Sequence, residues 1–271
     1  MTDVALVTGT SSGMGMHTAV ELAARGLRVV ATMRDTTRSE RLTQAAAERG
    51  VEVEVHALDV TDHAAAAGLV DQVGPVDILV NNAGQGSVST AEQLTMAQIQ
   101  AQLDINYLAP VNLAKLVLPG MRERGRGSIL TVTSVGGTVG QPFADAYCGA
   151  KFAVEGFMQS LAVVAERFGV HVRVVEPAAV SSEFVANVVR PTEPGPYDEL
   201  LNAYAARTAG AFANAQTPQA AAVAIADAAL SSESRFRWQT SDGATAFVGV
   251  SLADLDGERV LGFTRPWIAS S

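Results

Sequence analysis

Hydrophobic residues along this chain follow two alternating periodicities. Short apolar runs rich in β-branched residues predict buried strands, and they span residues 3–8, 28–33, 51–58, 76–81, 127–134 and 171–175. Segments with apolar residues at helical spacing lie between them, over about 13–25, 37–49, 97–124 and 146–168, and a further helix starts at about 62. Strand and helix alternate, which predicts an α/β fold: a doubly wound parallel sheet with right-handed crossovers, in three layers, α/β/α.

The regular alternation ends after Pro177. Three prolines and a glycine within residues 191–196 predict a hinge, and residues 197–212 have the pattern of a helix. We expect an insertion over about 183–216 that is either a substrate lid or a passive surface excursion.

The C-terminal part continues with one helix and one strand. Thr217 precedes a proline that suits the first turn of a helix over 218–230, and residues 235–240 predict a last strand. The tail, 241–271, has no pattern that assigns it. Because α/β sheets of this size are common as single units, we expect one domain over 1–271.

Composition describes a globular protein. Hydrophobic residues make up 48% of the chain, and no apolar run reaches the roughly 18 residues that a membrane span needs. The net charge is −9 without basic clusters, which argues against a nucleic-acid partner. The N-terminus shows no signal-peptide pattern, and the single cysteine, Cys148, suits a reducing compartment. We therefore expect a cytoplasmic protein without a membrane span. The histidines have no metal-ligand spacing, so we expect no catalytic metal.

A glycine-rich turn follows the first predicted strand. The run from Thr8 to Gly15, T-G-T-S-S-G-M-G, opens a helix, where glycines allow a sharp turn and helix N–H groups favour a pyrophosphate. At the end of the second strand, Arg34 and the Ser11 hydroxyl can bind a ribose 2′-phosphate, which predicts NADP(H). Alternatively, Arg34 and neighbouring Asp35 are a solvated loop pair.

Polar residues gather where later strands end. Asp59 and Val60 follow the third strand and are placed to meet an adenine, although Asp59 also suits the turn before the next helix. Asn81-Asn82-Ala83-Gly84 ends the fourth strand, and it would also form an ordinary polar turn. Asn106 is an awkward polar residue inside a helical segment, and it would be tolerated at a local kink beside a polar site. Ser134 ends the fifth strand.

Tyr147 and Lys151 are four residues apart on a predicted helix, so their side chains share one face. An ammonium beside a phenol favours the phenolate, which makes the pair a proton-transfer device. Alternatively, the two residues are ordinary surface residues of an amphipathic helix. Only two of the 19 basic residues are lysines, so a lysine at this position in an arginine-rich chain favours the functional interpretation.

Together these motifs resemble the short-chain dehydrogenase/reductase family over essentially the whole chain. Its T-G-x-x-x-G-x-G, N-N-A-G and Y-x-x-x-K patterns occur in order at 8–15, 81–84 and 147–151. The segment 135–184, with G-G-T-V-G-Q-P-F and A-Y-C-G-A-K-F-A-V-E-G, is similar to the estradiol 17-beta-dehydrogenase and retinol dehydrogenase branch. The resemblance implies a Rossmann fold and a homo-oligomer, a dimer or tetramer.

The resemblance implies catalytic roles for four residues. Tyr147 would protonate the forming alkoxide, and Lys151 would lower the pKa of Tyr147 and hold the nicotinamide ribose. Ser134 would donate a hydrogen bond to the substrate oxygen, and Asn106 would position a water that relays the proton outward.

It also implies cofactor contacts along the strand ends. These are Gly9, Ser12, Gly13 and Gly15 at the pyrophosphate, Asn82, Ala83 and Gly84 on the ribose side, Asp59 and Val60 at the adenine, and Pro177, Val180 and Ser182 at the nicotinamide, beside Ser11, Arg34, Tyr147 and Lys151. Ala178 stands where the family usually has glycine, which narrows the allowed backbone and weakens substrate inference from relatives.

The resulting hypothesis is an NADP(H)-dependent oxidoreductase that interconverts a ketone or aldehyde and an alcohol. The expected substrate is a moderately hydrophobic small molecule such as a steroid, a retinoid or a secondary-metabolite ketone. The alternatives are a 3-oxoacyl-thioester or biosynthetic ketoreductase and, from another class, a non-catalytic NADP-binding sensor.

Overall fold

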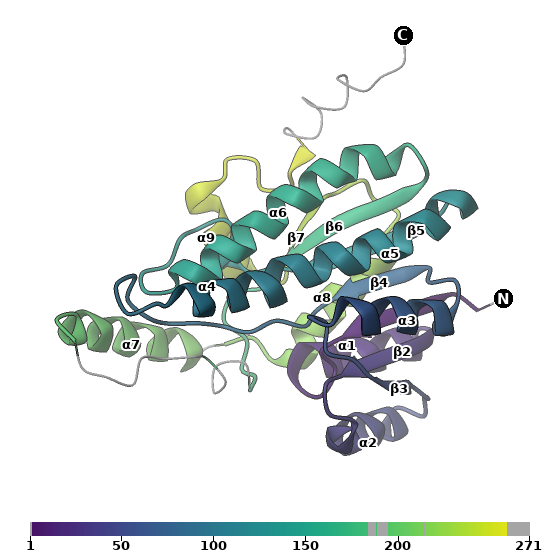
Figure 1. Ribbon diagram of the computed structural model, residues 1–271, viewed down its shortest axis with the longest axis horizontal. Coiled ribbons are helices and arrows are strands. Elements are labelled where there is room, and N and C mark those ends of the chain that lie inside the picture. Colours follow the sequence, from purple (N-terminus) through teal and green to yellow (C-terminus); the bar gives the residue numbers. More distant parts are fainter. Residues whose placement is uncertain (1, 184–187, 189–194, 214, 259–271) are drawn as a thin grey trace, which may run out of the picture.

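A seven-stranded parallel sheet forms the centre of the protein, in the order β3-β2-β1-β4-β5-β6-β7 (Figure 1). The computed structural model describes residues 2–183, 188, 195–213 and 215–258. The strands are β1 (Val4–Thr8), β2 (Arg28–Met33), β3 (Glu54–Ala57), β4 (Ile78–Asn81), β5 (Gly127–Val132), β6 (Val170–Glu176) and β7 (Arg237–Gln239). The predicted doubly wound parallel sheet is confirmed.

Helices cover both faces of the sheet. They are α1 (Gly13–Ala24), α2 (Glu40–Glu48), α3 (His63–Val73), α4 (Met96–Leu103), α5 (Ala109–Arg124), α6 (Asp145–Glu166), α7 (Asp198–Ala213), α8 (Pro218–Leu230) and α9 (Asp242–Ser251). Buried residues of α3, α5 and α6 pack on one face, and those of α1, α2 and α8 on the other, which gives the three predicted layers. In the part of the chain that the structure describes, no helix is both long and apolar enough to span a membrane.

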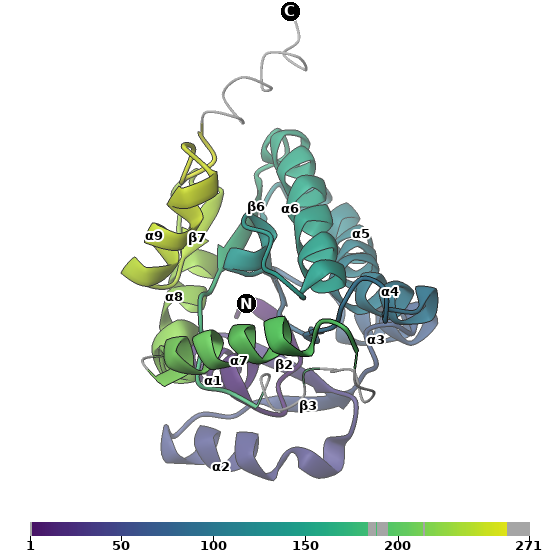
Figure 2. The same cartoon turned by 90° about the vertical axis from the view of Figure 1, so that its left-hand side faces the viewer.

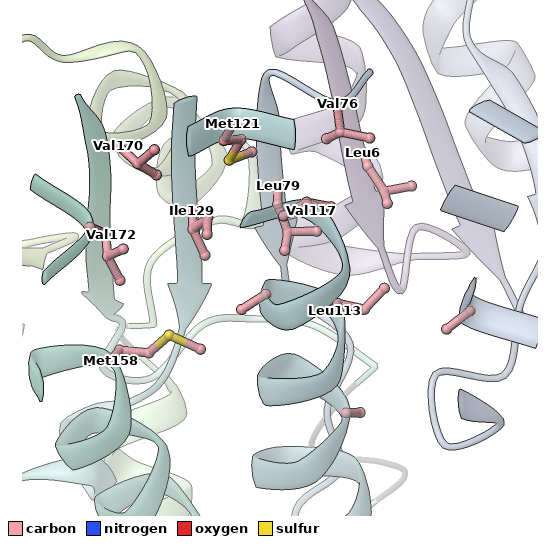
Figure 3. Packing of buried hydrophobic residues seen from close by; sticks show 14 of the residues in the cluster. Leu6, Val76, Leu79, Leu113, Val117, Met121, Ile129, Met158, Val170 and Val172 are labelled. Atoms are coloured by element: carbon pink, nitrogen blue, oxygen red, sulfur yellow. The ribbon is translucent and has the colours of Figure 1, made fainter. Parts of the chain in front are cut away.

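Successive residues of the central strands feed opposite cores. Leu79 and Ile129 point toward α5 and α6 (Figure 3), whereas their neighbours Val80 and Leu130 belong to the cluster that includes α1 and α8. All four side chains are nearly or fully buried, and each is worth about 1.5–3 kcal/mol in removal from water. Burial on both faces explains why these strands are continuous apolar runs.

Several element boundaries differ from the predicted ones. β5 ends at Val132, so Ser134 lies in the turn after the strand. The predicted helix over 97–124 is three pieces: α4, a π-helical turn η2 (Asp104–Leu108) and α5. The unassigned tail contains α9, whose buried Val248 packs against Val135. The ten residues of α9 include two glycines and three β-branched residues, which lower helix propensity, and so short a helix is marginal without a tertiary contact.

The sheet has its topological switch point between β1 and β4. From β1 the chain proceeds through β2 to β3 on one side, and it then returns to place β4 on the other side of β1. Ligands of doubly wound sheets bind outside the carboxyl ends of the strands at this point. The turns that follow β1 and β4 therefore meet where a ligand is expected.

Helix α7 lies beyond this end of the sheet in Figure 1 and crosses in front of it in Figure 2. It belongs to the predicted insertion over 183–216, of which residues 184–187, 189–194 and 214 lie outside the described residues. Two contacts fix α7 beside the strand ends. The ring of Tyr204 packs edge-on against the ring of Phe143, with 5.8 Å between the ring centres. The hydroxyl of Tyr197, the residue before α7, donates to the Glu92 carboxylate at 2.5 Å.

Candidate active site

The glycine turn after β1 brings two backbone segments unusually close together. Gly9 and Gly13 have left-handed φ values of 70° and 60°, which favour glycine. A Cβ atom at Gly9 would lie 2.8 Å from the Cα of Ala83, and one at Gly15 would lie 2.2 Å from Nδ2 of Asn82. The glycines are therefore required both for the turn and for its contact with the segment after β4.

Asn82 ties the two turns together. Its backbone N–H donates to the Thr8 hydroxyl at 3.0 Å, and its side-chain amide donates to the carbonyl oxygens of Thr8 at 2.9 Å and Gly9 at 3.1 Å. The Ala83 N–H also donates to the Thr8 hydroxyl, at 3.1 Å. Part of the N-N-A-G motif therefore acts structurally, by shaping the glycine turn.

A polar groove of about 320 Å³ runs along the ends of β1, β2, β3 and β4, and we name it the dinucleotide groove. Twelve residues that the sequence assigned to cofactor binding line it: Gly9, Ser11, Ser12, Gly13, Gly15, Arg34, Asp59, Val60, Asn82, Ala83, Gly84 and Ser182. Because residues from four strand ends and from the loop after β6 converge here, the groove has the extended shape that a dinucleotide needs.

Arg34 is exposed at the end of β2 and lines the groove. Asp35, its neighbour, is also exposed, and its carboxylate accepts hydrogen bonds from the N–H and hydroxyl of Thr37, at 3.0 and 2.6 Å. A second cation that the sequence analysis did not single out, Arg38, lines the same groove and lies 3.5 Å from a carboxylate oxygen of Glu183. This end of the groove therefore presents two guanidinium groups.

Asn106 occupies the π-helical turn between α4 and α5 and is only 1% exposed. Its amide donates to the Gln85 carbonyl at 2.9 Å and to Oε1 of Gln102 at 3.1 Å. The expected local distortion is confirmed, and π-helical turns are frequent at functional sites. A Cβ atom at Gly84 would lie 2.9 Å from Oδ1 of Asn106, which places this side chain against the groove.

Tyr147, Ser134 and Lys151 lie together where β5 meets α6. The Ser134 hydroxyl accepts a hydrogen bond from the Gly136 N–H at 3.0 Å, and it is hydrogen-bonded to the Tyr147 phenol. The Lys151 ammonium donates to the Val132 carbonyl at 3.0 Å and lies 5.8 Å from the centre of the Tyr147 ring. The predicted helical spacing of tyrosine and lysine therefore does bring the two groups to one face of α6.

Burial shifts the pKa of both groups toward their neutral forms. It raises the pKa of Tyr147 to about 12, and the hydrogen bond with Ser134 partly opposes this. It lowers the pKa of Lys151 to about 8, against the attraction of the Glu155 carboxylate. In the protein without a bound cofactor the pKa of Tyr147 is raised and not lowered as expected, because desolvation of the phenolate is the largest effect on it. At neutral pH the phenol therefore holds its proton.

A larger apolar cavity of about 1170 Å³ opens beside Tyr147, and we name it the substrate cavity. Its walls include Tyr147, Ser134, Lys151, the loop residues Val139 and Pro142, Pro177 and Val180 after β6, Tyr204 and Thr208 of α7, and Phe247 of α9. Met14, Asn82, Gly84 and Ser182 line both the cavity and the dinucleotide groove. The two spaces therefore meet next to the tyrosine.

The loop after β6 is compatible with Ala178. Among the described residues, Phe143 is the only non-glycine residue with positive φ, so Ala178 is not forced into a left-handed conformation. Its methyl group packs with the cluster of Val135, Ala244 and Val248. Ala178 therefore packs the loop against α9, and the expected restriction of its backbone causes no strain.

Sequence analysis missed the residues contributed by α7, α9 and the turn before α2. Tyr204, Thr208 and Phe247 reach the substrate cavity from segments without a recognisable motif, and Arg38 reaches the groove from a short 3₁₀ turn, η1 (Thr36–Arg38). A basic residue four positions after Arg34 was visible in the sequence. Its direction depends on the Asp35 cap that forms the turn.

Comparisons with known proteins agree with this geometry. The family model described as short chain dehydrogenase matches residues 3–193. Human retinol dehydrogenase 8 is 38% identical over 266 residues, which cover 93% of this chain and 86% of that protein. Human 17-beta-hydroxysteroid dehydrogenase type 1 is 40% identical over 194 residues, which cover 69% of this chain and 59% of that protein.

Solved structures show the same similarity. A short-chain dehydrogenase from Streptomyces avermitilis is 30% identical with a TM-score of 0.82, covering 98% of this chain and 96% of that chain. A candidate NAD(P) dependent gluconate 5-dehydrogenase from Beutenbergia cavernae, which contains NADP at low occupancy, is 27% identical with a TM-score of 0.74, covering 90% of this chain and 97% of that chain. The fold, the motifs in order and these matches show that the chain belongs to the short chain dehydrogenase family of nicotinamide-dependent oxidoreductases.

Proposed function

We propose that the protein is an NADP(H)-dependent oxidoreductase that interconverts a moderately hydrophobic ketone or aldehyde and its alcohol. The observation on which this depends most is the position of the Tyr147 phenol. It is hydrogen-bonded to Ser134, and it lies in an apolar cavity that shares walls with the dinucleotide groove. A proton donor, a hydroxyl partner and a groove for a hydride donor therefore converge on one point.

The groove fits a phosphorylated dinucleotide by its own chemistry. The glycines at 9 and 15 allow the turn to pack directly against Ala83 and Asn82, and the N–H groups at the start of α1, which no side chain caps, favour a pyrophosphate. Arg34 and Arg38 supply positive charge at the far end of the groove, which supports NADP(H) over NAD(H). When bound, the nicotinamide cofactor supplies or accepts the hydride.

The chain's own residues handle the proton. In the reductive direction Tyr147, protonated at neutral pH, donates its proton to the substrate oxygen as negative charge develops there. The Ser134 hydroxyl donates a second hydrogen bond to that oxygen. Lys151 is held by the Val132 carbonyl and lines the substrate cavity, and a Cβ atom at Gly84, which lines both spaces, would lie 3.6 Å from its Nζ. Asn106 anchors the π-helical turn, and we assign its amide to the proton path that leads outward.

The substrate class follows from the walls of the cavity. Val139, Pro142 and Phe247 are apolar, and most of the wall is apolar, although polar side chains also line it at Thr208 of α7 and Asp242 of α9 as well as at the tyrosine. Such a cavity orients a hydrophobic molecule with its single reactive oxygen toward the tyrosine. The similarity to proteins named for retinol and for 17-beta-hydroxysteroids supports a steroid, a retinoid or a secondary-metabolite ketone.

A substrate screen tests the proposal. NADPH oxidation should be followed with a panel of steroids, retinoids, aliphatic ketones and 3-oxoacyl thioesters, and with NADH in parallel. We expect turnover with at least one apolar carbonyl compound and a preference for NADPH. Turnover confined to acyl thioesters would favour the ketoreductase alternative. Binding of NADPH without turnover of any compound would favour the sensor.

We also propose that the protein is a homo-oligomer. Phe152, Val164 and Phe168 at the outer side and end of α6 are each about half exposed, at 46%, 48% and 46%. Val164 and Phe168 are four residues apart at the end of the helix, and exposed apolar groups of this kind are typical of contact surfaces between subunits. Sedimentation that finds a monomer alone at micromolar concentration would contradict this.

A further inference from the structure

A buried carboxylate lies on the same face of α6 as the candidate catalytic residues. Glu155 follows Lys151 by four residues and Tyr147 by eight, which places the three side chains along one stripe of the helix. It is only 2% exposed. A Cβ atom at Gly137 would lie 2.2 Å from Oε1 of Glu155, so a glycine leaves room for this carboxylate. Burying a charge is costly unless partners compensate it.

The partners of Glu155 come from the strand ends on the other side of the site. Oε1 accepts a hydrogen bond from the Thr133 hydroxyl at 2.8 Å, and Oε2 forms an ion pair with Arg237 of β7. The same guanidinium pairs with Glu176 at the end of β6. In order, Lys151, Glu155, Arg237 and Glu176 alternate in sign when both glutamates are ionised. Burial raises the pKa of both carboxyl groups, that of Glu176 to about 7, and the pairing with Arg237 opposes this.

This network is joined to both walls of the site. Thr133, the partner of Glu155, is the residue before Ser134, and its N–H donates to the Val175 carbonyl at 2.7 Å. Glu176 precedes Pro177, whose carbonyl accepts from the Val135 N–H at 3.0 Å. A displacement of the Glu155 carboxylate would therefore shift both the turn that contains Ser134, which we name the serine turn, and the loop after β6.

We propose that Glu155 is a positioning residue: its buried carboxylate, fixed by Thr133 and Arg237, keeps Lys151 cationic and holds the serine turn in register with α6. This rests on the proposed function, in which Tyr147 and Lys151 handle the proton. Glu155 itself lines neither the groove nor the substrate cavity, so it acts through Lys151.

The charges around Lys151 agree with this role. Lys151 lies beside the Tyr147 ring and the Glu155 carboxylate, both on α6, and Glu155 is paired with Arg237 of β7, which also pairs with Glu176 of β6. Burial lowers the pKa of Lys151 to about 8, and the Glu155 carboxylate is the group that opposes this. Removal of that negative charge should therefore lower the pKa of Lys151 further.

The small number of lysines makes a direct test feasible. The chain has only Lys115 and Lys151, so protein labelled with ¹³C at the lysine Cε gives two signals. Lys115 is exposed on α5, and K115R identifies its signal. In E155Q the pKa of Lys151 should fall by about one pH unit. The pKa of Lys115 should not move, because Lys115 does not contact the network.

Glu176→Gln is the matched control. Glu176 is equally buried and binds the same guanidinium, but it is one ion pair farther from Lys151. We expect E176Q to shift the Lys151 pKa by less than half as much as E155Q. Equal shifts in both variants, or no shift in E155Q, would overturn the proposal. Folding of E155Q is expected because Arg237 keeps Glu176 as a partner. If E155Q does not fold, T133V is the substitute. It removes the hydroxyl that donates to the Glu155 carboxylate, so it should lower the pKa of Lys151 by less than E155Q would. An unchanged pKa of Lys151 would overturn the proposal.

The pH profile of NADPH-dependent reduction gives the second readout. Activity that needs the Lys151 ammonium falls as the pH rises through the pKa of Lys151 in the assayed complex. In E155Q this alkaline limb should move about one unit to lower pH. A purely structural role would lower kcat/KM at all pH values and leave the limb in place. If wild type reduces no compound of the panel, the proposed function fails, while the NMR titration still decides the role of Glu155.

Discussion

Replacement of Asn106 by alanine tests whether this side chain anchors the turn between α4 and α5. The variant loses three hydrogen bonds: the amide no longer donates to the Gln85 carbonyl, at 2.9 Å, or to Oε1 of Gln102, at 3.1 Å, and Oδ1 no longer accepts the long bond from the Gln85 N–H, at 3.4 Å. Each bond contributes about 1 kcal/mol net, and a buried acceptor left unpaired costs about 1–3 kcal/mol. Gln102 is 3% exposed, so water cannot readily replace the lost donor.

These terms predict that N106A lowers the free energy of unfolding by about 2–4 kcal/mol, less roughly 0.6 kcal/mol for the better helix propensity of alanine. Urea unfolding, followed by circular dichroism, gives this value. Because the Gln85 segment adjoins the dinucleotide groove, we also expect weaker cofactor binding in N106A.

Asn112→Ala is the control for that measurement. Asn112 is also an asparagine in a helix, in α5, but its buried Nδ2 has no hydrogen-bond partner among the described residues. Its replacement loses no hydrogen bond of that amide and removes an unpaired buried donor, so it should leave the free energy of unfolding unchanged or raise it. If N106A costs no more than N112A, the hydrogen bonds of Asn106 do not stabilise the turn, and the assigned role is wrong.

Three further predictions concern the groove and the cavity. Arg34→Ala should weaken NADPH binding by about 10- to 100-fold and NADH binding little, measured by fluorescence titration; a wild type that prefers NADH contradicts this. Gly15→Ala should abolish dinucleotide binding, because its Cβ would lie 2.2 Å from Asn82 and displace the turn. Gly156→Ala, where no atom lies within 4 Å of the new Cβ, should bind normally. Equal binding in both variants would show that the close packing of the glycine turn is not required. Phe247→Ala should raise KM for apolar substrates without changing NADPH affinity. An unchanged KM would show that α9 does not contact the substrate.

The sheet and the glycine turn were predictable because their signals are local. Apolar runs, glycines and strand-end polar residues lie in single segments, and parallel topology brings those ends to one edge. The strand ends Thr8 and Asn81 illustrate this, because each is followed directly by the motif that lines the groove.

The remaining features depend on contacts between distant segments. The break at Asn106 is stabilised by Gln85, 21 residues away, and the carboxylate of Glu155 by Arg237, 82 residues away. No local periodicity encodes such pairs. For the same reason α9 was not predicted, since its helix is stabilised by burial of Val248 against Val135.

The central claim is that the Tyr147 phenol transfers the proton. Tyr147→Phe removes only the hydroxyl, and the cofactor groove is lined by other residues. With the best substrate of the panel, kcat of the variant should fall at least about a hundredfold while the Kd for NADPH stays within about twofold. A variant that binds NADPH normally and turns over at nearly the wild-type rate would contradict the account.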